Sequence, residues 1–114
     1  MLVPEEVLFR LRKMALTHPD QECCGLLTDD FQLLPVRNSA PDPRNTFVFD
    51  AAEYWSILKD LERQGRKVKA IYHTHPHGSA QPSKADLAYV ESSKRSSLIV
   101  SINDWKWLEY ADRH

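Results

Sequence analysis

The sequence predicts an α/β fold in which a mixed β-sheet is flanked by about three helices. Two observations support this. Three segments carry apolar residues at the helical spacing of about 3.6, and short runs rich in β-favouring residues lie between and after them. The order along the chain is helix, hairpin, strand, helix, strand, helix, hairpin. This alternation favours one sheet with helices packed against it.

The N-terminal part of the chain predicts a helix followed by a β-hairpin. Pro4 suits the first turn of a helix, and the helix should end near residues 17–19, because a residue before proline avoids the α region. Residues 22–28 predict a strand, Asp29-Asp30 a turn, and residues 31–36 the second strand of the hairpin. The apolar stripe of the helix should face the core and consists of Val7, Leu8, Leu11, Met14 and Ala15.

The middle of the chain predicts a loop, a short strand and a second helix. Residues 38–45 are rich in Pro, Asp, Asn and Ser, which is typical of a loop, and residues 46–49 predict a short strand. Asp50 is placed to cap a helix that Gly65 ends. We expect the loop residue Arg44 in solvent and not on a substrate. The apolar stripe of the helix, expected in the core, consists of Tyr54, Leu58 and Leu61, widened by Trp55 and Ile57.

The C-terminal part supplies the remaining strands and the third helix. Residues 68–75 form a mostly apolar, β-favouring run, and residues 77–82 are a loop that contains Gly and Pro. A helix should extend from Ser83 to about residue 94. Residues 97–102 are rich in β-branched side chains, and after an Asn-Asp turn residues 105–110 alternate like the return strand of a hairpin.

Composition limits the class of protein. A chain of 114 residues that is 42% hydrophobic should form a single domain, residues 1–114, whose core needs no disulfide or structural metal. The net charge of −1 gives no reason to expect nucleic acid or an anionic membrane as partner, and no apolar run could span a bilayer. Residues 1–6 lack the basic start of a secretion signal, and the adjacent Cys23 and Cys24 fit a reducing compartment. We therefore expect a cytoplasmic protein with free thiols.

Two histidines at strand spacing, His73 and His75, are the first candidate functional residues. Because strand side chains alternate with a period of two, both imidazoles should lie on one face at the strand end, where Pro76 stops the pairing. Two neutral imidazoles on one face are a natural start for a zinc site. The alternative is two ordinary surface or core histidines, since short His-x-His matches also arise by chance.

A carboxylate follows at the start of the third helix. Ser83 is a good N-cap, and Asp86 falls in the first turn, where the helix dipole favours an acid. Two histidines and Asp86 would supply three ligands and leave a fourth position open to water, as in a catalytic zinc site. Ser83-x-x-Asp86 is also close to a capping box, in which Asp86 reaches back to the Ser83 N–H. Taken alone, this tetrapeptide favours the capping interpretation.

A fourth residue, Glu22, lies far upstream, directly before Cys-Cys-Gly-Leu-Leu. A glutamate that does not bind the metal can take a proton from water and give one to a leaving amine. With Glu22 included, the chain resembles the JAMM (MPN+) metallopeptidases over roughly residues 4–110, and it departs from their pattern only at Thr74, where the family often has serine. The motif residues occur here in the family's order: Glu22, His73, His75, Pro76, Pro82, Ser83 and Asp86.

The resemblance implies a JAMM fold, similar in layout to the cytidine deaminases, and a metal site. It implies that Zn²⁺ is held by His73, His75 and Asp86, with Glu22 as general acid/base and Ser83 as a helper of the water and the oxyanion. A carbonyl or carboxylate should hold the second ring nitrogen of each histidine. His77 has no role in the family pattern and is expected in solvent. A zinc deaminase is rejected, because the chain lacks His-x-Glu and a later Pro-Cys-x-x-Cys.

The implied reaction is hydrolysis of a peptide or isopeptide bond. The small prokaryotic stand-alone members of the family imply a substrate class, the C-terminal tail of a ubiquitin-like or sulfur-carrier protein. Two alternatives stay open: a non-catalytic MPN-type binding scaffold, although scaffolds typically lose ligands that this chain keeps, and a phage-tail-like peptidase acting on cell-wall peptides. Since the core should be stable by itself, removing the metal is expected to abolish activity but not the fold.

Overall fold

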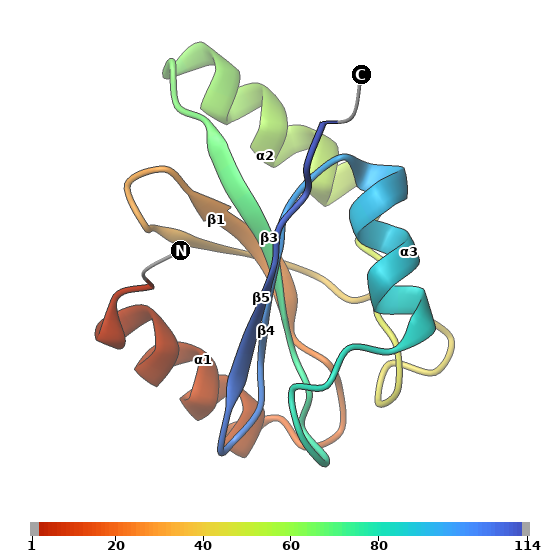
Figure 1. Cartoon of the computed structure of the whole chain (residues 1–114). Helices are drawn as coiled ribbons and strands as arrows, with labels where there is room; N and C mark the ends of the chain where they lie inside the picture. The colour runs from red at the N-terminus through yellow and green to blue at the C-terminus, as the bar shows by residue number, and fades with distance from the viewer. Residues whose placement is uncertain (1–2, 113–114) are drawn as a thin grey trace.

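The computed structural model describes residues 3–112 and packs helices on both faces of one five-stranded sheet (Figure 1). The strand order is β2-β1-β3-β4-β5. Strands β3 and β4 pair in parallel and the other neighbours are antiparallel, so the predicted mixed α/β fold is confirmed. In chain order the elements are α1 (Glu5–Thr17), β1 (Cys24–Thr28), β2 (Leu33–Val36), α2 (Ala51–Arg63), β3 (Val68–Thr74), α3 (Lys84–Ser93), β4 (Ser97–Val100) and β5 (Trp105–Leu108).

Each face of the sheet has its own apolar core. Helix α1 covers one face, while α2 and α3 lie over the other (Figure 1). The predicted stripe of α1 is confirmed, with Met14 only partly buried. The α1 face buries Val7, Leu8 and Leu11 against Leu27, Ala70, Tyr72, Leu98 and Val100. The opposite face buries Leu26, Val36, Phe47, Phe49, Leu61 and Ile71, with Tyr54, Leu58 and Tyr89 packed against them.

The central strand, β3, contributes to both cores because its side chains alternate between the faces. Ala70 and Tyr72 point to α1, and Ile71 points to α2 and α3. Tyr72 pairs with Gly25 of β1, where a Cβ atom would lie 2.5 Å from the tyrosine hydroxyl and 2.4 Å from the Leu34 carbonyl oxygen. Only glycine therefore lets the Tyr72 ring lie across β1.

Local sequence signals position the helix ends as predicted. Asp50 caps α2 by accepting a hydrogen bond from the Glu53 N–H at 3.0 Å. Gly65 follows the C-cap of α2 with φ +66°, a left-handed conformation that glycine adopts without strain. Ser83 caps α3, so the chain re-enters regular structure where the sequence indicated.

The structure corrects three expectations. Glu22 lies outside the sheet, because β1 begins at Cys24. Residues 46–49 form no strand. Phe49 makes only an isolated β-bridge with Asn38, and the Val48 N–H donates to the Asn38 side chain instead of to another strand. Trp55 is 61% exposed and lies beside Lys59, because it falls about 100° around the helix from Tyr54 and outside the buried stripe.

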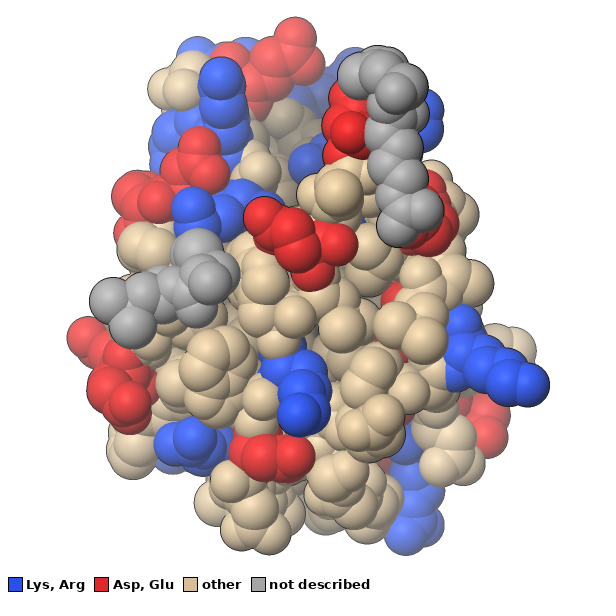
Figure 2. Space-filling model, in the orientation of Figure 1, with Lys and Arg blue, Asp and Glu red and all other residues tan. Residues whose placement is uncertain are grey.

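None of the helices within residues 3–112 combines the length and the hydropathy needed to cross a bilayer. On the face shown in Figure 2, acidic and basic side chains are intermingled, in keeping with a formal net charge of −1. Met1 and Leu2 of the N-terminal segment, and the last two residues of the expected domain 1–114, lie outside the described residues.

Candidate metal centre

The two histidines lie at the end of β3, on the face covered by α2 and α3. His73 is the last residue but one of the strand and is 1% exposed, with its ring stacked on Phe47 at a centroid distance of 4.5 Å. His75 follows the strand directly, and its N–H donates to the Val100 carbonyl. The two Nε2 atoms are 3.2 Å apart. The prediction that both imidazoles share one face is confirmed.

Asp86 brings a carboxylate to the same point from the first turn of α3. Its Oδ1 lies 3.2 Å from His73 Nε2, and its Oδ2 lies 3.1 Å from His75 Nε2. Two ligands of a tetrahedral zinc at about 2.0–2.1 Å would be about 3.3 Å apart. The three side chains therefore converge at separations close to those of a zinc ligand set.

The tautomer of His75 decides what these contacts mean. Its Nδ1 lies 2.9 Å from the Ser79 carbonyl oxygen, which can only accept, so Nδ1 carries a proton. In the neutral ring Nε2 then has a lone pair, and this lone pair faces the Asp86 carboxylate. Two acceptors at 3.1 Å repel each other unless a cation lies between them. That cation is either a proton on His75 or a metal ion, and the donor set suits a metal.

Asp86 is both a cap and a member of this cluster. Ser83 Oγ accepts from the Asp86 N–H at 3.0 Å, and Asp86 Oδ2 accepts from the Ser83 N–H at 2.9 Å, which completes the predicted capping box. Burial would raise the pKa of Asp86, but hydrogen bonds with His73 and His75 outweigh it and hold this pKa well below its usual value. The capping and ligand interpretations are thus compatible, since the cap fixes the carboxylate beside the histidines.

The histidine pKa values move in opposite directions. Burial lowers the pKa of His73, and the bond to Asp86 opposes this only in part. Burial also disfavours the charged form of His75, but Asp86 and the Ser79 carbonyl outweigh it and raise the pKa of this ring. A neutral, buried His73 is the form that a metal requires.

Glu22 is buried beside the histidines although it belongs to no strand. It is 6% exposed, and one carboxylate oxygen lies within 4.8 Å of a ring nitrogen of both His73 and His75. Two hydrogen bonds hold the backbone of Glu22. The Glu22 N–H donates to the Pro43 carbonyl, and the Glu22 carbonyl accepts from Asn38 Nδ2. Burial raises the pKa of Glu22 to about 7; His75 lowers it and Asp86 raises it.

The other predicted residues lie as follows. Ser83 is exposed, and its Oγ accepts a hydrogen bond in the cap. His77 is exposed as expected, with Nε2 2.7 Å from the Pro19 carbonyl oxygen and 3.1 Å from Arg44 Nε, so Arg44 contacts this loop. Cys23 and Cys24 are free thiols, as predicted. Cys23 is half-buried and Cys24 is buried, and burial raises the pKa of both thiols.

One expectation about the histidines is wrong in part. The second ring nitrogen of His75 is held by a carbonyl, but Nδ1 of His73 is buried and has no hydrogen-bond partner among the described residues. The cause is local: the His73 ring is inserted beside Phe47 in the apolar core of the α2 and α3 face.

Sequence reasoning missed the residues that bring Glu22 to the site. Thr74 Oγ1 accepts from the Cys23 N–H, and the Thr74 N–H donates to the Cys23 carbonyl, so the segment with Glu22 lies against the end of β3. The Asn38 amide joins Glu22 to the loop, donating to the Thr46 carbonyl and accepting from the Val48 N–H. The only available signal was the Asn- and Pro-rich composition of the loop, which does not specify these partners.

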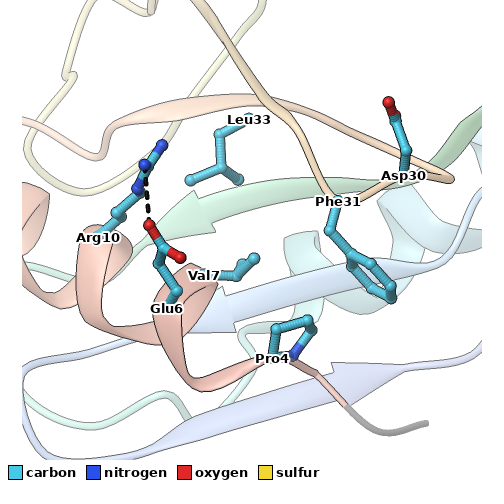
Figure 3. Close-up of a pocket in the computed structure, with 7 residues that line it drawn as sticks. All are labelled: Pro4, Glu6, Val7, Arg10, Asp30, Phe31 and Leu33. Atoms are coloured by element: carbon cyan, nitrogen blue, oxygen red, sulfur yellow. Dashed lines mark hydrogen bonds and ion pairs between the residues drawn. The ribbon is translucent and has the colours of Figure 1, made fainter.

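Several pockets of the described residues lie away from the histidines, and two of them are as follows. One, of about 250 Å³, lies between the start of α1 and the β1–β2 turn (Figure 3). It is on the α1 face, and its Arg10 and Glu6 already pair at 3.0 Å. The second, of about 360 Å³, borders Cys23, the neighbour of Glu22, and is lined in part by Asn38 and Glu53.

Comparison with known proteins identifies related chains. Residues 4–110 match the family described as prokaryotic homologues of the JAB domain. A protein of Thermus thermophilus named probable TtuB-protein conjugate cleaving protease is 33% identical over 90 residues, covering 76% of this chain. The desampylase of Haloferax volcanii is 33% identical over 88 residues, covering 72% of this chain. The matched parts span 61% and 63% of the lengths of these two relatives.

Solved structures share the fold. The solution structure of protein DSY2949 from Desulfitobacterium hafniense superposes with a TM-score of 0.70 at 25% identity, covering 88% of this chain and 73% of that one. A protein from Salinibacter ruber gives a TM-score of 0.59 at 24% identity, covering 94% and 80%, and supports the fold alone.

Proposed function

The chain belongs to the family of prokaryotic JAB-domain homologues, the JAMM/MPN group, and we propose that it is a zinc-dependent isopeptidase of this family. The observation that carries the proposal is the convergence of His73 Nε2, His75 Nε2 and the Asp86 carboxylate at separations of 3.1–3.2 Å. We propose these three residues as the zinc ligands. In the same proposal residues 1–114 are one JAMM domain, and the protein is cytoplasmic, in keeping with its free thiols.

Two of the three proposed zinc ligands, His75 and Asp86, are held in orientation by hydrogen bonds before any metal binds. Zn²⁺ held there would act as a Lewis acid and would lower the pKa of a water molecule towards about 7. The Ser79 carbonyl fixes the His75 ring with its Nε2 lone pair directed at the cluster. The capping box fixes Asp86 in the same way from the other side. Neither ligand needs to reorganise when the cation binds.

Glu22 is proposed as the general acid/base and not as a ligand. Its carboxylate lies within 4.8 Å of both histidine nitrogens and is therefore also close enough to hold a metal with them. The Asp86 oxygens lie at 3.1–3.2 Å from the same two rings and are the proposed ligands, so the role of Glu22 as a base rests on its pKa. A base is most effective when its pKa lies near the working pH, and burial raises the pKa of Glu22 to about 7. A bound cation would lower this value. Glu22 takes a proton from the attacking water and passes it to the departing amine.

Ser83 is proposed as the donor to the developing oxyanion. Its Oγ accepts from the Asp86 N–H, and a hydroxyl that accepts can still donate its own hydrogen. One such donor is typically worth roughly 3–4 kcal/mol of transition-state stabilisation.

The proposed substrate is the C-terminal tail of a ubiquitin-like or sulfur-carrier protein in a conjugate. The Thermus relative is named as a protease that cleaves TtuB–protein conjugates and the Haloferax relative as a desampylase, and the similarity to both supports this class.

The test is the zinc content and turnover of four forms: wild type, His75→Ala, Asp86→Asn and Glu22→Gln. We expect about one zinc per chain in the wild type and in Glu22→Gln, and a loss of zinc in the other two. Asp86→Asn keeps an oxygen for the cap but loses the anionic ligand, so full zinc affinity in this variant would leave Asp86 with the capping role alone. Turnover is measured on a ubiquitin-like conjugate.

Chelation provides the second arm of this test. It should abolish hydrolysis and leave far-UV circular dichroism nearly unchanged, because both cores are built from apolar side chains and only the His73 ring, stacked on Phe47, joins the cluster to one of them. Unfolding on chelation would indicate a structural metal instead. Tight binding of the conjugate without hydrolysis in the zinc-loaded wild type would favour the scaffold function.

A further inference from the structure

The loop that follows His75 is held at two points, one at the end of β4 and one in the β4–β5 turn. At its start, the His75 N–H donates to the Val100 carbonyl at 2.9 Å. Five residues later, the Ala80 N–H donates to Asp104 Oδ1, also at 2.9 Å. The first contact continues the parallel pairing of β3 with β4. The second is a bond from the backbone to a carboxylate 24 positions away, and the proposed chemistry does not account for it.

Asp104 is itself held firmly in the turn. Ser101 Oγ donates to Asp104 Oδ1 and also lies 3.2 Å from the Asp104 N–H, while the Ser101 N–H donates to the Asp104 carbonyl at 2.9 Å. Ser101 is fully buried and Ala80 is fully buried. The carboxylate therefore presents Oδ1 to the loop from a fixed position.

The Ala80 N–H and the Ser79 carbonyl belong to the same peptide group. This group is planar and trans, so its N–H and its carbonyl point in opposite directions. Its N–H is bound by Asp104, and its carbonyl accepts from His75 Nδ1 at 2.9 Å. One peptide plane thus connects the carboxylate in the β4–β5 turn to the ring of His75.

We propose that Asp104 is a positioning residue for the metal centre, acting through the Ser79–Ala80 peptide to hold the His75 ring in the Nδ1–H tautomer with Nε2 facing His73 and Asp86. The proposal deepens the proposed function, because it states how one ligand of that site is oriented. Without the Asp104 bond, only the loop itself would fix the peptide plane, and the carbonyl could turn away from His75. A charged acceptor at the N–H also polarises the peptide and strengthens its carbonyl as an acceptor.

The first measurement is made without metal. Nitrogen-15 NMR of the His75 ring shows which ring nitrogens carry a proton. It is recorded over a series of pH values up to the range in which the ring is neutral, because the pKa of His75 is raised above the ordinary histidine value of about 6.5. We expect the Nδ1–H form in the wild type, a mixture of both tautomers in Asp104→Ala, and a return to the Nδ1–H form in Asp104→Asn, whose amide oxygen can still accept from the Ala80 N–H. An unchanged tautomer in Asp104→Ala would overturn the proposal.

The second measurement is zinc affinity, with zinc alone as the probe in competition with a chelator. Loss of a residue that orients a ligand typically lowers metal affinity 10–100-fold, so we expect about this loss in Asp104→Ala and a smaller loss in Asp104→Asn. Asn103→Ala, an exposed change in the same turn, is the matched control and should bind zinc like the wild type. An equal loss in Asn103→Ala, or Asp104→Asn as weak as Asp104→Ala, would mean general damage to the turn and would overturn the proposal.

The two proposals fail separately. If the wild type binds no zinc, the proposed function fails, while the tautomer comparison still decides the role of Asp104. If the wild type binds zinc through His75 but the Asp104 variants keep both tautomer and affinity, only the positioning role fails. Should Asp104→Ala not fold, Asp104→Ser replaces it, because its shorter side chain suits the turn but cannot reach the Ala80 N–H.

Discussion

The two faces of the sheet use the same strand for different purposes. Neighbouring residues of β3, Tyr72 and His73, are both fully buried, and each has one polar atom without a partner in the described chain: the tyrosine hydroxyl and His73 Nδ1. On the α1 face Tyr72 is surrounded by aliphatic side chains such as Leu11 and Leu27. On the other face His73 lies against Phe47 but directs Nε2 to His75 and Asp86.

The difference shows what each face tolerates. Burying a polar atom without a partner costs roughly 1–3 kcal/mol, and each face carries one such atom; on the α1 face Tyr72 lies alone among apolar side chains. The α2 and α3 face instead gathers two imidazoles and two carboxylates, from His73, His75, Glu22 and Asp86, into one buried cluster. Burying these polar and charged groups is tolerable only when they form hydrogen bonds or ion pairs with one another, or bind a common cation. The α1 face should therefore determine stability, and the other face activity.

The largest expected effect is on the functional face, in Glu22→Gln. The amide keeps the shape of the side chain but cannot accept a proton, and general acid/base catalysis is worth 10²–10⁴-fold. We expect hydrolysis to fall by about that factor, which corresponds to roughly 3–5 kcal/mol, with zinc content and substrate affinity nearly unchanged. Turnover, binding and metal content are measured on the same preparations. Equal turnover in the two forms would remove Glu22 from the mechanism.

On the α1 face, Leu11→Ala should affect stability alone. Leu11 is fully buried, and deleting a core leucine costs about 2–5 kcal/mol, because a cavity replaces the lost contacts. We expect this decrease in the free energy of unfolding in urea, with zinc stoichiometry unchanged. Leu16→Ala is the matched control on the same helix, since Leu16 is 59% exposed and should change stability by less than about 0.5 kcal/mol. Loss of zinc from folded Leu11→Ala would show that the two faces are coupled.

The pH dependence of stability should differ between wild type and Glu22→Gln in the metal-free protein. Burial raises the pKa of Glu22 from its ordinary value of 4.5 to about 7, so between these values the folded state holds more protons than the unfolded state. Stability should therefore fall as pH rises through this window. At about 1.4 kcal/mol per pKa unit the full shift corresponds to about 3 kcal/mol, which solvent screening at the open side of the site reduces to roughly 2 kcal/mol. Denaturant unfolding at several pH values should give a flatter profile for Glu22→Gln. Parallel profiles would mean that Glu22 is well solvated.

The smallest effect is expected for Tyr72→Phe. This change removes a buried hydroxyl that has no partner and keeps the ring over Gly25, so stability should stay constant or rise by up to about 1 kcal/mol. Turnover should be unchanged, because the ring faces α1. A clear loss of stability, measured by thermal unfolding against the wild type, would indicate that a water molecule satisfies the hydroxyl.

Much of the fold could be predicted because its signals are local. The period-two placement of His73 and His75, the capping box of Ser83 and Asp86, and the Asp50 and Gly65 helix ends each depend on residues a few positions apart. Periodicity and capping act over that range, so one sequence is enough to locate them. The stripe of α2 failed at Trp55 because a run of apolar residues does not state how wide the covered face is.

The sequence by itself determined two features of the site, because both depend on local spacing. Asp86 lies in the first turn of its helix, and His73 and His75 lie on one face of the sheet. Only the tertiary structure decided that Glu22 lies beside the histidines. Its neighbour Cys23 bonds Thr74, which is 51 residues away in the sequence. The Glu22 carbonyl is held by Asn38 from an irregular loop. The Phe47 stack on His73 and the bond from Asp104 to the Ala80 N–H are likewise long-range. Such contacts form where strand pairing and loop closure bring distant segments together, and no spacing within one segment records them.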